Sequence, residues 1–133
     1  MSPDGYLLDS SALLALIENE PGADRVEGIL QQDTVWLTWL TPLEIYYVTC
    51  RERGQAEAEK RYALIKQLPA KIIWEMDEPT LLTAGHLKAE YRLSLADAII
   101  AAHAIRANAI LVHKDPEFET VSGELKLETL PYK

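Results

Sequence analysis

Strands that alternate with helices along the chain predict an α/β protein of three layers, with a parallel sheet between two layers of helices. Two observations carry this prediction. Short apolar runs, rich in β-branched and aromatic residues, have the length of buried strands, and segments of helical length separate them. The chain has 133 residues, of which 48% are hydrophobic, so we expect residues 1–133 to form one domain with a substantial core. In chain order, the expected strands are 6–8, 34–38, 71–75, 109–113 and a candidate fifth at 125–130, and the expected helices are 11–20, 22–32, 41–53, 55–68, 79–91 and 94–108.

Capping residues and prolines set the ends of these helices. Ser10 or Ser11 is expected to cap the first helix, Asp77 the fifth and Ser94 the sixth. Pro42 stands at the first position of its helix, where its missing N–H costs nothing. Connections between the parallel strands should be right-handed crossovers.

The composition narrows the classes of function. The net charge is −8 and the isoelectric point about 4.8, which excludes a binder of nucleic acid that is basic over its whole surface. An enzyme whose acidic site is neutralised by bound cations is still compatible with this charge. Cys50 is the one cysteine, so neither an intramolecular disulfide nor a Cys-rich zinc site is expected. The N-terminus has no basic segment typical of a signal peptide, and no apolar run is long enough to span a membrane. We therefore expect a cytoplasmic protein.

Four carboxylates recur where strands end or helices begin. Asp9 ends the first strand, and Asp115 follows the fourth strand by two residues. Glu44 and Asp97 each lie in the first turn of a helix. Because ligands bind beyond the carboxyl ends of the strands in open α/β sheets, Asp9, Glu44 and Asp115 are expected to gather at that edge. Asp97 joins them if its helix starts at the same edge.

Each of these acids also has an explanation that involves no ligand. The spacing of Glu44 from Thr41, and of Asp97 from Ser94, fits a capping box, in which the acid serves the helix terminus. The other two acids fit an ordinary cap and an ordinary turn. The coincidence of four such acids beside apolar runs favours a shared site. Clustered carboxylates repel one another unless cations lie between them, and a site made of oxygen ligands suits Mg²⁺ or Mn²⁺.

Four stretches of the chain carry a family resemblance. They are YLLDSSALLAL (6–16), TPLEIYYV (41–48), LSLADAIIAAHAI (93–105) and AILVHKDPEF (109–118). In this order they resemble the PIN-domain ribonucleases, and specifically the small VapC-like toxins of bacterial and archaeal toxin–antitoxin pairs. The most specific piece is LADAIIAAHA followed by ILV-x-x-D. The resemblance implies a five-stranded parallel sheet and a Mg²⁺- or Mn²⁺-dependent endoribonuclease.

The resemblance also assigns roles to residues. Carried over position by position, the acids that bind metal and act in catalysis fall on Asp9, Glu44, Asp97 and Asp115. Members of the family often carry one more acid just after the last of these, and Glu117 matches that place as a further metal ligand. His113 departs from the pattern, because relatives commonly have Thr or Ser two residues before the final Asp.

Partners follow from the resemblance and from the surface. The resemblance implies an RNA substrate, a homodimer, and a small antitoxin that lies across the acidic groove and reaches the carboxylates with an arginine. Residues 45–48 are more apolar side chains than one core-facing stripe of a helix can bury. This surplus favours an interface on the helix pair 41–68. Lys114 is a candidate for phosphate contact. A basic cluster fits either a phosphate-contacting rim or, because glutamates interrupt it, a solvated face. Its members are Arg51, Arg53, Lys60, Arg61, Lys66 and Lys71.

Two other classes of protein compete with the nuclease. A phosphoacceptor receiver domain has a similar length and sheet, but it would need paired acids after the first strand and an acceptor Asp after the third. Asp4 and Asp9 are too far apart for such a pair, and Asp77 lies outside the apolar strand. A catalytically silent module that binds RNA or protein would have no physical need for four mutually repelling carboxylates, although His113 keeps this alternative open.

Overall fold

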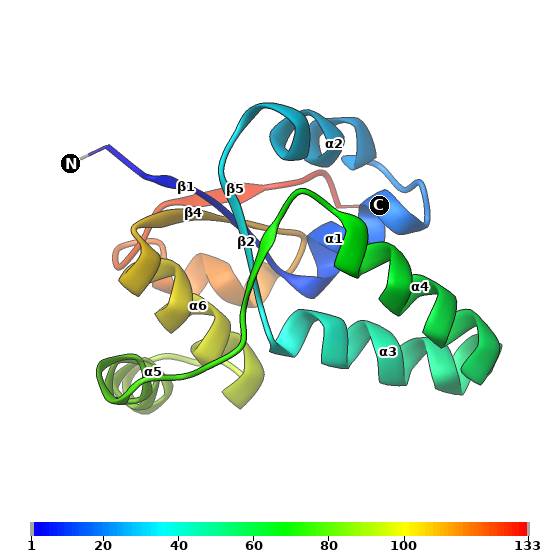
Figure 1. The fold of residues 1–133 in the computed structure, drawn as a ribbon. Helices are drawn as coiled ribbons and strands as arrows, with labels where there is room; N and C mark the ends of the chain where they lie inside the picture. Colours follow the sequence, from blue (N-terminus) through cyan, green and yellow to red (C-terminus); the bar gives the residue numbers. More distant parts are fainter. Residues whose placement is uncertain (1, 133) are drawn as a thin grey trace.

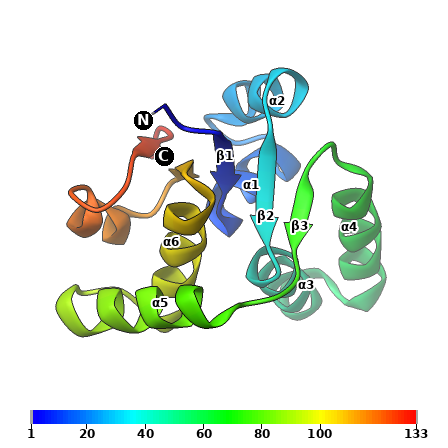
Figure 2. The same ribbon diagram turned by 60° about the vertical axis from the view of Figure 1, so that its left-hand side comes forward.

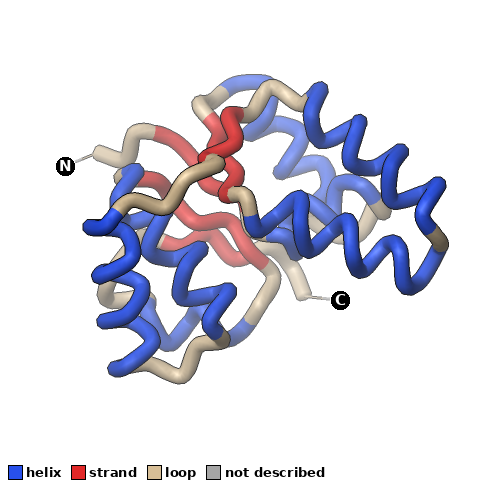
Figure 3. The backbone as a smooth tube through the Cα atoms, turned by 60° about the horizontal axis from the view of Figure 1, so that its bottom comes forward, coloured by secondary structure: helices blue, strands red, loops and turns tan. Residues whose placement is uncertain are grey.

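The computed structural model describes residues 2–132, which build a five-stranded sheet covered by helices on both faces (Figure 3). All neighbouring strands are parallel, and their order across the sheet is β3-β2-β1-β4-β5. The strands are β1 (Gly5–Leu8), β2 (Val35–Thr38), β3 (Lys71–Ile73), β4 (Ala109–His113) and β5 (Leu127–Thr129). This confirms the predicted three-layer α/β/α architecture with a five-stranded parallel sheet.

The helices divide into two groups, one on each face of the sheet. Helices α1 to α4 lie on one side, and α5, α6 and the 3₁₀ helix η1 lie on the other (Figure 1). Figure 2 shows α3 and α4 as a hairpin beside β3. The helices are α1 (Ser10–Ile17), α2 (Ala23–Gln32), α3 (Leu40–Arg53), α4 (Gln55–Gln67), α5 (Glu78–Glu90), α6 (Leu95–Ala107) and η1 (Pro116–Val121).

Successive residues of the two central strands face opposite layers. Leu7 and Leu111 pack with α5 and α6, whereas Leu8 and Val112 pack with α1 to α4. Side chains alternate along a strand, so a strand that is covered on both faces needs consecutive apolar residues. This explains why the strands appear in the sequence as unbroken apolar runs. The residues that follow β1 and β4 are therefore anchored by strands that are packed on both faces.

The structure confirms some of the predicted helix caps and contradicts others. Asp77 and Ser94 cap α5 and α6 as expected. The prediction that a serine caps α1 is wrong, because Asp9 is the N-cap and accepts a hydrogen bond from the N–H of Ala12. The predicted capping box at Thr41 is also absent, because α3 already begins at Leu40 and the Thr41 hydroxyl is buried without a hydrogen-bond partner among the described residues. For the same reason the prediction that Pro42 is the first residue of its helix is wrong, and Pro42 is the third.

The sequence patterns also miss some local structure. The turn after β4 winds into η1, an element that they do not predict. The third and fifth strands are shorter than expected, at three residues each. Both are edge strands, which pair on one side only, so fewer of their residues join the ladder. Within the described part of the chain, no helix has the length and apolar character to cross a membrane.

Gly5 is the glycine at which we expect a substitution to damage the fold. A Cβ on Gly5 would overlap the carbonyl oxygen of Thr34 and approach the Trp36 ring to 2.9 Å. Because backbone cannot move aside cheaply between paired strands, Gly5→Ala should lower the free energy of unfolding by about 2 kcal/mol or more. Gly28 in α2 has nothing within 4 Å of its added Cβ, so Gly28→Ala should instead stabilise by roughly 0.5–1 kcal/mol. Urea unfolding of both variants checks this pair, and equal effects would contradict it.

Candidate metal centre

The four predicted acids line one cavity at the carboxyl edge of the sheet. The cavity has a volume of about 230 Å³. Asp9 follows β1 and Asp115 follows β4, and these two strands are neighbours in the centre of the sheet. The residues that line the cavity are Asp9, Ser10, Ser11, Leu14, Glu44, Val48, Asp97, Ile100 and Asp115. The structure therefore brings together residues that lie more than 100 positions apart in the sequence.

Asp9 is held by the start of α1. Its Oδ1 accepts hydrogen bonds from the N–H of Ala12 at 2.8 Å and from the Ser11 hydroxyl at 2.7 Å. Ser11 Oγ also accepts the backbone N–H of Lys114 at 2.9 Å. One hydroxyl thus ties the end of β1 to the residue before Asp115. Sequence reasoning treated Ser11 only as a possible cap, although its place beside Asp9 is a signal for this role.

Glu44 reaches the cavity from α3. With the capping box absent, its carboxylate accepts a hydrogen bond from the Ser10 hydroxyl at 2.7 Å. Ser10 and Ser11 therefore each hold one acid of the cavity. Both serines of the dipeptide after Asp9 therefore have a part in the site that the sequence patterns do not predict.

Asp97 enters the cavity because α6 runs antiparallel to β4. The turn between them is short, with Asn108 in the left-handed conformation at a φ of 54°. A helix of 13 residues is about 20 Å long and a strand of five residues about 17 Å, by the usual rise per residue. The start of α6 and the end of β4 therefore lie at nearly the same level, which places Asp97 opposite Asp115.

The capping box at Ser94 forms only by half. The Ser94 hydroxyl accepts the N–H of Asp97 at 3.1 Å, as a cap should. The reciprocal bond, in which the acid accepts the N–H of Ser94, is made by Glu117 at 2.9 Å. Because Glu117 occupies this position, the Asp97 carboxylate is not used by its own helix terminus and faces the other acids.

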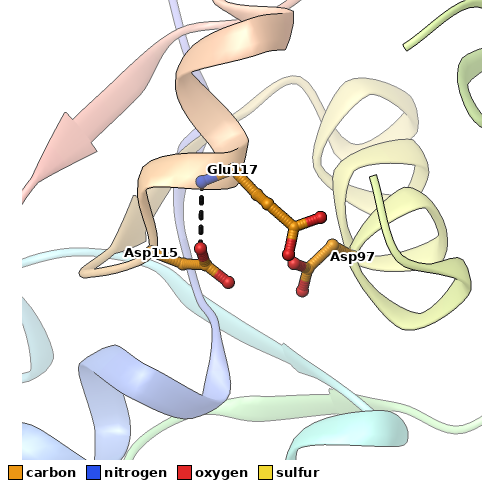
Figure 4. A group of neighbouring side chains, drawn as sticks. All are labelled: Asp97, Asp115 and Glu117. Atoms are coloured by element: carbon orange, nitrogen blue, oxygen red, sulfur yellow. Dashed lines mark hydrogen bonds between the residues drawn. The ribbon is translucent and has the colours of Figure 1, made fainter. Parts of the chain in front are cut away.

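Asp97, Asp115 and Glu117 form the tightest group. One carboxylate oxygen from each lies within 4.8 Å of the others. Figure 4 shows the three side chains converging from α6, the end of β4 and η1. Asp115 also caps η1, with its Oδ1 2.9 Å from the backbone N of Glu117. This bond fixes Asp115 and Glu117 relative to each other.

Burial and crowding raise the pKa of two carboxyl groups in the cavity. Burial is the main cause at Asp9, and it raises the pKa from 3.8 to about 7 even though two hydrogen-bond donors favour the charged form. Burial, followed by the negative charge of Asp115 and a hydrogen bond with it, raises the pKa of Asp97 from 3.8 to about 8. Loss of water thus outweighs the local donors, and the cavity holds protons near neutral pH.

These residues fit a hard divalent cation. The potential ligands are all carboxylate oxygens, which Mg²⁺ and Mn²⁺ prefer. A cation among them would offset both the cost of burying the charged carboxylates and their mutual repulsion, and it would displace the bound protons. Asp97, Asp115 and Glu117 are close enough to share one ion, and Asp9 and Glu44 bound the same cavity.

Lys114 does not face this cavity, contrary to the expected phosphate contact. Its ammonium donates to the carbonyl of Pro21 at 3.0 Å and lies 3.6 Å from a carboxylate oxygen of Glu20. Only 9% of the side chain is exposed. Lys114 therefore ties the end of β4 to the chain after α1, and its charge is already balanced there.

The basic cluster is also largely occupied within the fold. Arg61 is buried and lies 3.2 Å from Glu18 and 3.7 Å from Glu57. Lys66 lies over the rings of Tyr62 and Trp74. These contacts favour the reading of a paired and solvated face over a continuous rim for phosphate.

The comparisons with known proteins agree with this geometry. A family model described as PIN domain matches residues 6–124. The chain belongs to the PIN domain family. This membership excludes the receiver-domain alternative. No curated protein matches the chain in sequence.

Solved structures share the PIN fold over nearly the whole chain. VapBC2 from Rickettsia felis, bound to a DNA fragment from its promoter, has a TM-score of 0.78 at 20% identity, covering 95% of this chain and 98% of that one. DNA-bound VapBC from Salmonella typhimurium has a TM-score of 0.75 at 20% identity, covering 97% and 98%. VapC20 from Mycobacterium tuberculosis, a toxin that cleaves the sarcin-ricin loop, has a TM-score of 0.70 at 14% identity, covering 86% and 93%. At these identities the likeness shows the fold alone.

Proposed function

We propose that this PIN domain is a Mg²⁺- or Mn²⁺-dependent endoribonuclease that hydrolyses RNA phosphodiester bonds. The observation that carries the proposal is the convergence of Asp97, Asp115 and Glu117 within 4.8 Å, in a cavity that Asp9 and Glu44 also line. VapC20, which shares this fold, cleaves the sarcin-ricin loop. This supports RNA as the substrate class.

The chain's own residues have separate parts in this proposal. Asp97, Asp115 and Glu117 hold the cation, and Asp9 and Glu44 complete its surroundings. When bound, the cation lowers the pKa of a water molecule and neutralises charge on the phosphoryl oxygens. The attacking water loses its proton to Asp97 or Asp115.

We further propose that the protein is the toxin of a toxin–antitoxin pair and binds a second copy of itself. The relatives from Rickettsia felis and Salmonella typhimurium were crystallised as VapBC complexes. Their likeness supports an antitoxin partner. An apolar cavity of about 260 Å³ between α3, α4 and the segment after β3 supports a protein interface on the predicted helix pair. Leu43 and Trp74 beside it are 51% and 54% exposed.

Cleavage of a mixed pool of end-labelled structured and single-stranded RNAs tests the nuclease. We expect cleavage with Mg²⁺ or Mn²⁺ and none with EDTA. Asp115→Asn should lower the rate on the order of 100-fold or more, because it removes one charged oxygen from the acidic group. Glu27→Gln, which changes an exposed acid on α2, is the matched control and should cleave like the wild type.

Two results would contradict the proposal. Cleavage that persists in EDTA would exclude the acidic group as a metal centre. A folded protein that neither binds Mn²⁺ nor cleaves any RNA would instead support the catalytically silent binding module.

A further inference from the structure

His113 lies at the end of β4 with both ring nitrogens engaged. The side chain is fully buried. Its Nδ1 lies 3.1 Å from the backbone N of Asp115, and its Nε2 lies 3.2 Å from the hydroxyl of Thr129 on β5. The ring thus spans from the turn that carries Asp115 to the neighbouring strand of the sheet.

The surrounding donors decide which nitrogen carries the proton. The backbone N–H of Asp115 can only donate, so Nδ1 must accept and carries no hydrogen. The Thr129 hydroxyl donates to Glu119 at 2.8 Å, so its oxygen accepts from the ring. His113 is therefore the neutral Nε2–H form, and each of its hydrogen bonds has one direction.

The same ring also supports the helix that follows. It packs edge-on against Phe118 of η1, with centroids 5.1 Å apart, and Phe118 is fully buried. Asp115 caps η1, and Glu117 lies in its first turn. His113 therefore contacts the backbone of Asp115 and the ring of Phe118, on either side of Glu117, and it is not among the residues that line the cavity.

We propose that His113 is a positioning residue of the acidic centre, which fixes the backbone of Asp115 so that Asp115 and Glu117 converge on Asp97. This inference rests on the proposed function, because it assigns His113 a part in holding the same cation. The bond from Nδ1 to the N–H two residues on has the form of an Asx turn, which an asparagine side chain also makes. An apolar residue of similar size would fill the space but leave the Asp115 N–H without an acceptor.

Two substitutions separate positioning from packing. His113→Asn keeps an acceptor for the Asp115 N–H, whereas His113→Leu keeps apolar volume and has no acceptor. Both lose the ring contact with Phe118. On stability alone, a buried leucine should equal or exceed a buried asparagine. If His113 positions Asp115, metal affinity should instead be higher in His113→Asn than in His113→Leu.

The test compares Mn²⁺ dissociation constants of the wild type and both variants by electron paramagnetic resonance, below the unfolding temperature of each. We expect His113→Leu to weaken binding by about 10–100-fold, the usual effect of losing a residue that orients a metal ligand. His113→Asn should stay within about threefold of the wild type by the same reasoning. Thermal unfolding of the metal-free proteins, followed by circular dichroism, should rank His113→Leu at or above His113→Asn.

A second readout needs no metal. Two-bond ¹H–¹⁵N correlation of the histidine rings should show His113 as the Nε2–H tautomer. An Nδ1–H tautomer would overturn the inference, and so would wild-type Mn²⁺ affinity in His113→Leu. If the wild type itself binds no Mn²⁺, the proposed function fails and this inference with it, so the two failures are distinguishable.

Discussion

Replacing Asp97 by asparagine should stabilise the metal-free protein and greatly slow RNA cleavage in the presence of metal. The carboxyl group of Asp97 has a pKa of about 8 in the folded protein, against 3.8 ordinarily, so its ionised form is disfavoured by folding. At pH 9 this cost is fully present, and Asp97→Asn removes it. Discounting for partial exposure, we expect a gain of about 1–2 kcal/mol in the free energy of unfolding. Cleavage should fall on the order of 100-fold or more, because a ligand and candidate base are lost.

Thermal unfolding with EDTA and with Mn²⁺ tests both the stabilisation of the metal-free variant and its loss of metal binding. In EDTA at pH 9, Asp97→Asn should melt at a higher temperature than the wild type. With Mn²⁺ at 100 times its dissociation constant, the wild type should gain about 2.7 kcal/mol by linkage, and the variant much less. The order of the two melting temperatures should then reverse. Glu27→Gln should follow the wild type under both conditions, and a variant that is less stable in EDTA would refute the electrostatic account.

Metal affinity should fall steeply as the pH falls from 8 to 6. Asp9, with a pKa of about 7, and Asp97, with a pKa of about 8, must lose their protons before they coordinate a cation. Below both pKa values each group weakens binding by up to about tenfold per pH unit, so the combined loss should be roughly 100-fold or more. Calorimetric titration of Mn²⁺ at pH 7.5, in two buffers with different enthalpies of ionisation, should show protons released on binding.

The stability of the metal-free protein should have the matching dependence on pH. A carboxyl group whose folded pKa is raised contributes stability that is fully present below its unfolded pKa of 3.8. That contribution is lost as the pH rises through the folded pKa values near 7 and 8. For these two groups, urea unfolding in EDTA should therefore show a decline between about pH 5 and 8 that Asp97→Asn reduces. Proton release near zero and a flat stability profile would mean that the acids are ionised without a cation.

The sequence predicts the scaffold well because local signals agree with the global fold. The apolar runs at β1 and β4 and the caps at Asp77 and Ser94 each have a physical reason that operates over a few residues. The same local reasoning fails at Thr41 and at the first helix. Helix α3 begins at Leu40 without a side-chain cap from Trp39, and α1 is capped by Asp9 and not by a serine.

The arrangement of the acids is only partly accessible from sequence. The rule for parallel sheets brings Asp9 and Asp115 to one edge without a structure. Asp97 could also have been placed, since a helix joined to the next strand by a one-residue turn must run antiparallel to it. The exchange in which Glu117 takes the N–H of Ser94 could not, because it depends on η1 and on contacts between residues 23 positions apart.

The position of Asp97 beside Asp115 and Glu117 is the central claim, and anomalous scattering from a crystal soaked in Mn²⁺ tests it most directly. We expect an anomalous peak bounded by carboxylate oxygens of Asp97, Asp115 and Glu117, which should vanish in a crystal of Asp97→Asn that is otherwise unchanged. A saturated crystal with no peak in this cavity, or with Mn²⁺ bound only elsewhere, would contradict the assignment of a metal centre to the carboxyl edge of the sheet.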